Sequence, residues 1–112
     1  MSSVLRPATA KVGAVNAQAV ERYKEMRKAL MEVPEVDQKT CEIVHACQLA
    51  ALGVEISFKM HAIRLFDLKV SKEALQHIIV SGVGVTLIIG QAARVLDWIE
   101  EAHAHYLGTR QQ

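Results

Sequence analysis

The chain has 112 residues, of which 51% are apolar and only 4% are aromatic, and its formal net charge is +1. This length indicates one domain, which buries about two-thirds of the surface of its unfolded chain. Because 13 basic residues nearly balance 12 acidic ones, the charge excludes an electrostatic nucleic-acid binder. A core built from Ala, Val, Leu, Ile and Met favours helices, so we expect an all-α fold whose apolar faces are covered by partner subunits.

The first fifteen residues differ in composition from the rest. They are rich in Ser, Ala and Val without periodicity, so we expect residues 1–15 to form a flexible N-terminal arm or a strap onto a neighbour. Residues 16–112 then form the single folded domain. The N-terminus lacks the apolar core of a signal peptide. Cys41 and Cys47 lie about 9 Å apart along a helix and cannot pair there, and unpaired thiols favour a cytoplasmic location.

Two helices are predicted in the first half of the domain. Asn16 is a suitable N-cap for a helix over 17–33, which Pro34 ends. Its apolar face would contain Val20, Tyr23, Arg27, Leu30 and Val33, which follow a three-four spacing. Asp37 can cap a second helix that runs to Leu52, and Gly53 fits the position just after its end.

The segment from Glu55 to Ala62 alternates polar and apolar residues, which is typical of a half-buried strand. A helix fits equally well, with a seam of Ile56, Met60, Ile63 and Phe66. No second strand is available to pair with it, so we predict a helix. Ser71 would cap a short helix after it.

A final long helix is predicted over 85–106, after a bend at Gly82 and Gly84. Its inner seam would contain Ala92, Val95, Leu96, Ile99, Ala102 and Tyr106. Residues 74–93 contain no charge and are long enough to span a bilayer. Their polar residues and glycines, and the charged sequence on both sides, argue against a membrane span. We therefore expect a buried helix pair or a subunit interface.

Glu42 and His61 are a candidate pair for chemistry, although two residues nineteen apart are weak evidence by spacing alone. A carboxylate beside an imidazole fixes the ring tautomer and raises its basicity, which makes a proton relay. Ser57 lies four residues before His61 on the same helical face and could hold a water or a substrate oxygen. Arg64 and Lys59 flank His61 and could bind an anionic substrate. We nevertheless expect both cations to be solvated charges on the helix face. The Glu–His pair could instead be a buried structural contact.

Other polar clusters carry weaker signals. Cys41 and His45 share a helical face as metal ligands do, but no matching second pair exists, so we expect neither a metal nor a cofactor. Glu42 and His45 could form a surface contact one turn apart. His103 and His105 point to different faces of a helix and fit a solvated helix end.

Several short motifs resemble, in order and spacing, the carboxymuconolactone decarboxylase superfamily, which includes the alkyl hydroperoxidase D proteins. They are Lys39-Thr40-Cys41-Glu42, Ala50-Ala51-Leu52-Gly53, His61 and Val70-Ser71-Lys72-Glu73-Ala74-Leu75. In the redox branch a Glu precedes a Cys-x-x-Cys-x-x-x-His run. Counted back from His61, Val54 and Ser57 occupy the cysteine positions. The resemblance implies that the acid/base half of the site is kept and the disulfide half is lost. The family usually has Gly where this chain has Lys69, so an altered turn is expected there.

The resemblance also implies a compact orthogonal domain of five to six helices that assembles as a homotrimer or homohexamer. Its function would be cofactor-free acid/base chemistry by His61 and Glu42 on a small carbonyl or lactone compound, as in a carboxy-lyase. The alternative is a non-catalytic oligomeric binding or scaffold member. A peroxidase is a distant third hypothesis, because it would need Cys41 or Cys47 to replace the missing pair.

Overall fold

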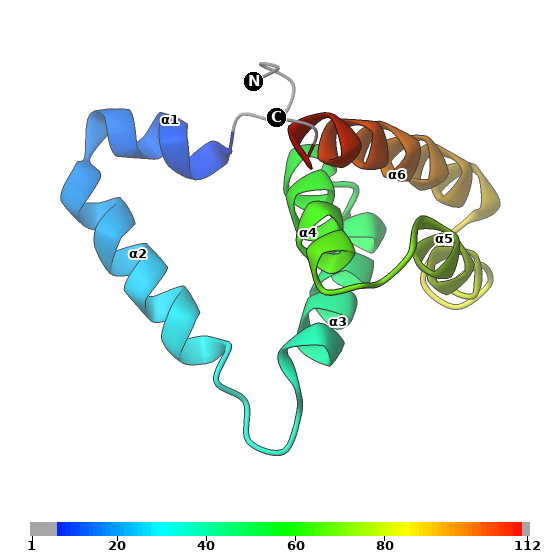
Figure 1. Ribbon diagram of the computed structural model, residues 1–112, viewed down its shortest axis with the longest axis horizontal. Coiled ribbons are helices and arrows are strands. Elements are labelled where there is room, and N and C mark those ends of the chain that lie inside the picture. The colour runs from blue at the N-terminus through cyan, green and yellow to red at the C-terminus, as the bar shows by residue number, and fades with distance from the viewer. Residues whose placement is uncertain (1–6, 111–112) are drawn as a thin grey trace.

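The computed structural model describes residues 7–110, and this range contains six α-helices and no strand (Figure 1). The helices are α1 (Ala8–Val15), α2 (Ala17–Leu30), α3 (Gln38–Leu52), α4 (Glu55–Asp67), α5 (Lys72–Val80) and α6 (Ile89–Arg110). The prediction of an all-α fold is confirmed. Residues 55–62, which also fitted a strand, belong to α4.

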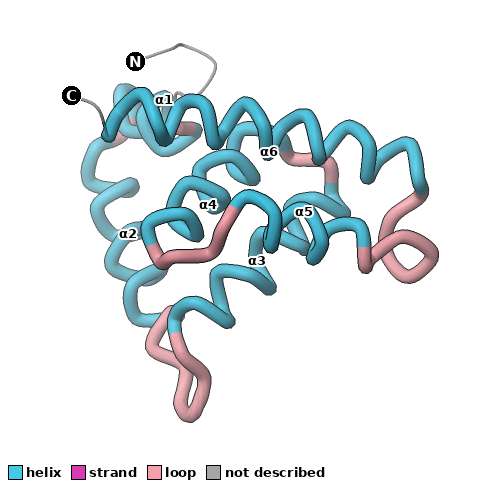
Figure 2. Tube along the Cα trace, turned by 45° about the vertical axis from the view of Figure 1, so that its right-hand side comes forward, coloured by secondary structure: helices cyan, strands magenta, loops and turns pink. Residues whose placement is uncertain are grey.

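Helices α3 to α6 form the body of the molecule, as the tube in Figure 2 shows. Helix α4 packs against both α3 and α6, and α5 packs against α6. Their shared core is almost entirely aliphatic, with Phe58, Phe66 and Trp98 as its buried aromatic residues. The fully buried members of the core are Ala46, Ala50, Phe58, Ala62, Leu65, Leu75, Val95, Ile99 and Ala102. The predicted inner seam of α6 is largely confirmed, although Leu96 and Tyr106 are only partly buried.

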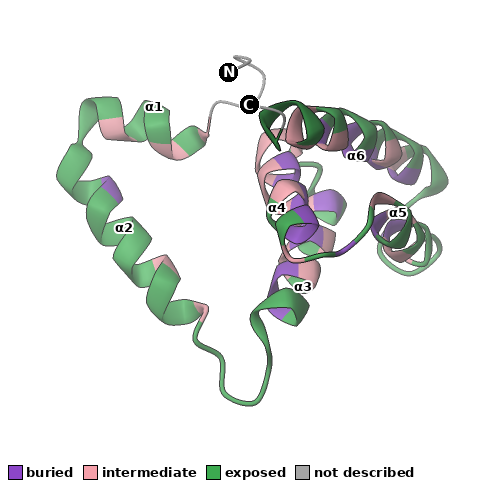
Figure 3. Ribbon diagram, in the orientation of Figure 1, coloured by how far each residue is buried: buried purple, intermediate pink, exposed green. Residues whose placement is uncertain are grey.

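Helices α1 and α2 form a hairpin that stands away from this body, and Figure 3 shows that nearly all of its surface is exposed. Residues 8–15 are therefore helical rather than aperiodic, while the rest of the predicted arm lies outside the described residues. Val20 is the one buried residue of α2. The predicted spacing falls on a helix, but its apolar side chains are mostly not buried, since Tyr23 and Leu30 are 48% and 58% exposed. Within residues 7–110, no other helix covers this face.

Side-chain caps set the starts of three helices as predicted. Asn16 accepts a hydrogen bond from Ala19 N, Asp37 from Thr40 N and Ser71 from Ala74 N. The ends were less predictable: α2 stops at Leu30, before Pro34 is reached. Helix α6 begins at Ile89 rather than at residue 85. The reason is a turn in which the Gly82 carbonyl accepts bonds from the N–H groups of residues 85, 86 and 87.

Helices α3 and α4 each end in a turn of the same type. At the end of α3, Gly53 N bonds to Ala50 O and the next N–H reaches back to residue 49, with Gly53 at φ 76°. At the end of α4, Lys69 N bonds to Phe66 O and the next N–H reaches back to residue 65, with Lys69 at φ 73°. This is the Schellman motif, which favours glycine at the left-handed position. The expectation of an altered turn at Lys69 is wrong, because the lysine adopts the strained conformation instead.

The buried face of α4 differs from the predicted seam. Phe66 is buried as expected, but Phe58, Ala62 and Leu65 fill the core beside it. Ile56 and Met60 instead line a pocket on the side of α4 that faces the hairpin. The uncharged stretch 74–93 forms α5, the following turn and the start of α6. Among the described helices, none has the length and apolar character needed to cross a membrane.

Candidate functional site

The fold brings Glu42 of α3 and His61 of α4 together, as the sequence predicted. His61 Nδ1 lies 2.6 Å from Glu42 Oε2. The Glu42 side chain is 4% exposed, and the His61 side chain is 16% exposed. Arg64 Nη1 lies 3.8 Å from the other carboxylate oxygen, Oε1, and the Arg64 side chain is 56% exposed. Two oxygens of one buried carboxylate therefore face two different cationic or ionisable groups.

Burial lowers the pKa of the His61 imidazole below its ordinary value, against the opposing effect of the Glu42 hydrogen bond and charge. His61 is therefore neutral near pH 7. An ionised carboxylate only accepts hydrogen bonds, so Nδ1 is the nitrogen that carries the proton. This leaves Nε2 with its lone pair, as a general base requires.

A pocket of about 700 Å³ lies between the hairpin and the α3–α4 pair. Glu42, Ser57 and Arg64 form part of its wall, whereas His61 does not line it. The other lining residues are Pro7, Ala8, Thr9, Tyr23, Lys24, Arg27, Lys28, Met31, Glu32, Gln38, Ile56 and Met60. Of the predicted pair, Glu42 therefore borders the pocket, and His61 contacts Glu42 without lining the pocket.

The wall contributed by α2 is basic and was missed by the sequence reading. Lys24, Arg27 and Lys28 line the pocket opposite Ser57 and Glu42. With Arg64, four basic residues face two acidic ones, Glu32 and Glu42. The signal was present in the sequence as basic residues at positions i, i+3 and i+4 of one helix. It could not be recognised because only the tertiary structure sets this helix face opposite Glu42.

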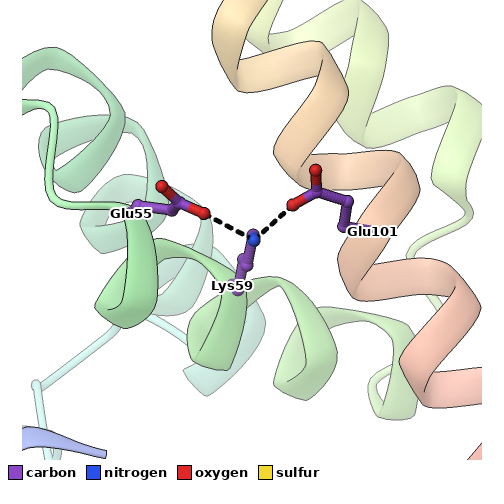
Figure 4. A network of polar contacts seen from close by, with 3 residues as sticks. All are labelled: Glu55, Lys59 and Glu101. Atoms are coloured by element: carbon purple, nitrogen blue, oxygen red, sulfur yellow. Dashed lines mark hydrogen bonds and ion pairs between the residues drawn. The ribbon is translucent and has the colours of Figure 1, made fainter. Parts of the chain in front are cut away.

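Lys59 lies elsewhere. Its side chain is 1% exposed, and its ammonium donates to Glu55 Oε2 at 2.7 Å and to a carboxylate oxygen of Glu101 on α6 (Figure 4). Burial alone would lower the pKa of Lys59, but the hydrogen bonds that its ammonium donates to the two carboxylates, together with their negative charges, outweigh burial and raise this pKa. The structure therefore does not bring Lys59 to the pocket, and the expectation that it is a solvated charge is wrong. It links α4 to α6.

His45 is the residue near the pair that sequence reasoning undervalued. It lies one turn after Glu42, and its ring centroid is 6.3 Å from that of His61 with the ring planes at 85°. Its Nδ1 is buried without a hydrogen-bond partner. No group of three or more His, Cys, Asp or Glu side chains placed to hold a metal ion is found within residues 7–110.

The two thiols lie within α3. Cys41 is buried and Cys47 is half-buried against the core, and both are free. Burial raises the pKa of the Cys47 thiol, which lowers the fraction of reactive thiolate at neutral pH.

No protein-family model, no curated protein and no solved structure matches this chain. The resemblance to carboxymuconolactone decarboxylases therefore rests on the motif residues themselves. Glu42 and His61, two of these motif residues, are in contact.

Proposed function

We propose that the chain is a carboxymuconolactone decarboxylase-like protein that performs cofactor-free acid/base chemistry on a small anionic carbonyl or lactone compound. The observation that carries this proposal is the buried Glu42 carboxylate, which is hydrogen-bonded to His61 and also borders a pocket with basic walls. A pocket of about 700 Å³ is in the size range of small-molecule sites. Assembly as a homotrimer or homohexamer is part of the proposal, as the family resemblance implies.

The basic side chains give the pocket its preference for an anion. Arg27 and Lys28 on α2 lie across the pocket from Arg64 on α4. A substrate carboxylate bound among them would exchange water for charge-assisted hydrogen bonds. With the carboxylate held by Arg27 and Lys28 of α2, the carbonyl of the same molecule would face Ser57 and Glu42 on the α3–α4 wall, where Arg64 also lies.

The proposed reaction follows from this placement. When the carboxylate leaves as CO₂, the electron pair of the broken C–C bond moves onto the adjoining carbon and into the carbonyl. The Ser57 hydroxyl donates a hydrogen bond to the resulting enolate oxygen. One proton must then be added to carbon. His61, which is 16% exposed, takes up a proton from solvent at Nε2 and releases its Nδ1 proton to Glu42, which delivers that proton to the substrate carbon.

The test is turnover of carboxylated γ-lactones, followed by CO₂ release. We expect Glu42→Gln and His61→Ala each to lower kcat/KM by about 10²-fold or more, as the loss of a general acid/base does. His77→Ala is the matched control, because this exposed histidine on α5 is remote from the pocket lining. Wild-type-like turnover in both site variants would refute the proposal.

A non-catalytic binding protein is the second candidate function, because the open, basic pocket would also hold an anion without converting it. Ligand-induced thermal stabilisation by the same lactones, without CO₂ release by the wild-type protein, would favour this candidate. A thiol peroxidase has less support. Cys41 is buried, and the raised pKa of Cys47 opposes thiolate chemistry.

A further inference from the structure

His45 is a half-buried histidine beside the Glu42–His61 pair, and the proposed reaction does not use it. Its ring stands at 85° to the His61 ring, and the two ring centroids are 6.3 Å apart. The Nδ1 atom of His45 is buried and has no hydrogen-bond partner among the described residues. Buried polar atoms nearly always have a partner, and the exceptions in native proteins are often catalytic groups or sites where water binds.

The three side chains form a series that leads away from the pocket. Glu42 borders the pocket, and His61 contacts Glu42 without lining it. His45 lies beside His61 and is likewise not part of the pocket lining. Of the two ring nitrogens of His45, only Nδ1 is both buried and unpaired, so Nε2 is the nitrogen that reaches solvent. The series therefore connects the pocket with the protein surface through the α3–α4 pair.

The two imidazoles also interact electrostatically. Burial is the largest cause that lowers the pKa of His61, and the charges of Arg64 and His45 act in the same direction. A proton gained by one ring therefore makes it harder for the other ring to gain a second one. A pair of rings that interact in this way exchanges a single proton more readily than it holds two.

We propose that His45 transfers protons between solvent and the His61–Glu42 pair. A substrate in the pocket excludes water from Glu42 on that side, so during the reaction a proton has to arrive from the side of the two histidines. The rings share no direct hydrogen bond, and one water molecule can bridge two ring nitrogens. The role of His45 in turnover rests on the proposed function, whereas the transfer itself does not. His45 acts only through His61, so it is a positioning residue for the proton.

The transfer moves one proton in and one proton out. His45 takes up a proton at Nε2 and releases its Nδ1 proton to the bridging water. This water passes a proton to His61 Nε2, and His61 gives its Nδ1 proton to Glu42. Both rings change tautomer, and the reverse transfers, begun by water in the emptied pocket, restore them.

The first test needs no substrate. It measures by NMR how fast the proton between His61 Nδ1 and Glu42 exchanges with water. This proton leaves only after Nε2 has gained another, because an imidazolate anion would otherwise form. His45→Phe keeps an aromatic ring beside His61 but cannot carry a proton, and we expect it to slow the exchange by about tenfold or more. Loss of packing alone would instead open the site and speed the exchange.

Two further variants accompany this test. His45→Gln, which keeps a polar side chain without an ionisable ring, should slow the exchange as His45→Phe does. His77→Phe is the matched control, because His77 is exposed on α5 and remote from the pocket lining, and it should leave the exchange rate unchanged. Circular dichroism verifies that each variant keeps its helices. Unchanged or faster exchange in both His45 variants would overturn the inference.

The second test separates this inference from the proposed function. His45→Ala should release CO₂ from carboxylated γ-lactones about tenfold more slowly than the wild-type protein, and added imidazole should restore the rate. Turnover by His45→Ala at the wild-type rate would overturn the inference, even where Glu42 and His61 variants are inactive. Slower proton exchange in His45→Phe, with no lactone turnover by the wild-type protein, would support the transfer and count against the proposed function.

Discussion

Removal of the Lys59 charge and removal of its partners should have opposite effects on stability. The Lys59 side chain is 1% exposed, whereas those of Glu55 and Glu101 are 43% and 58% exposed. Lys59→Met deletes the buried charge and keeps an unbranched side chain in its place. The two carboxylates then turn toward water at little cost. Glu55→Ala/Glu101→Ala instead leaves the ammonium buried without a partner.

The expected magnitudes follow from this asymmetry. Replacement of a buried ion by an apolar side chain of similar volume is typically neutral or stabilising by about 1–4 kcal/mol. We place Lys59→Met between about 0 and 2 kcal/mol of added stability, because both partners are already partly solvated. The double glutamate variant should lose about 3–5 kcal/mol, as a buried charge without its partners does. For a domain of this size, each 1 kcal/mol shifts Tm by about 4 °C.

Urea unfolding at pH 7 measures both effects. Trp98 is the only tryptophan and is 5% exposed. Its ring centroid lies 6.0 Å from that of Phe58, which precedes Lys59 in the chain. Its fluorescence therefore reports on this part of the core. Protomer concentration is held constant, because assembly would add to the apparent stability. Glu25→Ala is the matched control, because Glu25 is an exposed glutamate on α2. The reasoning would be refuted if Lys59→Met lowered the free energy of unfolding by more than about 2 kcal/mol while the double variant lowered it by less than about 1 kcal/mol.

Two further predictions concern the turn after α4 and the site. Lys69→Gly should stabilise the protein by about 0.5–1 kcal/mol in urea unfolding, because glycine adopts φ 73° without strain. Lys69→Ala, which keeps a Cβ, should show no such gain, and equal gains would contradict the explanation. Glu42→Gln should lower the pKa of His61 further in an NMR titration, because the Glu42 carboxylate raises this pKa against burial. Since the folded-state pKa lies below the ordinary value, the unfolded chain binds more protons, and stability should fall as pH drops below about 6.5. A higher His61 pKa in Glu42→Gln would show that the carboxylate has no such role.

Local signals predicted the helices well where the cause was itself local. Asn16, Asp37 and Ser71 cap helices through their own side chains, and Gly53 ends α3 in the left-handed conformation. Such signals act within four residues and need no knowledge of the fold. The early end of α2 and the late start of α6 were not predicted. The turn built on the Gly82 carbonyl combines several hydrogen bonds that spacing alone does not specify.

The site was predicted in part for a similar reason. Spacing and resemblance selected Glu42, Ser57 and His61, and the structure brings the first and last into contact. Lys59 and Arg64 could not be distinguished, because both flank His61 on α4. The packing of α6 decides between them, since Glu101 lies over Lys59 and leaves Arg64 half-exposed beside the pocket.

By itself, the sequence determined an all-helical chain, the starts of three helices and the pair Glu42–His61. These properties follow from apolar content, capping side chains and motif spacing, which are encoded within short segments. The tertiary structure alone decided that Glu42 rather than His61 borders the pocket and that a basic face of α2 lies opposite. It also decided that Tyr23 and Leu30 on α2 stay about half exposed. A periodic helix offers several faces, and only the position of the other helices determines which face is buried, which meets the site and which stays in water.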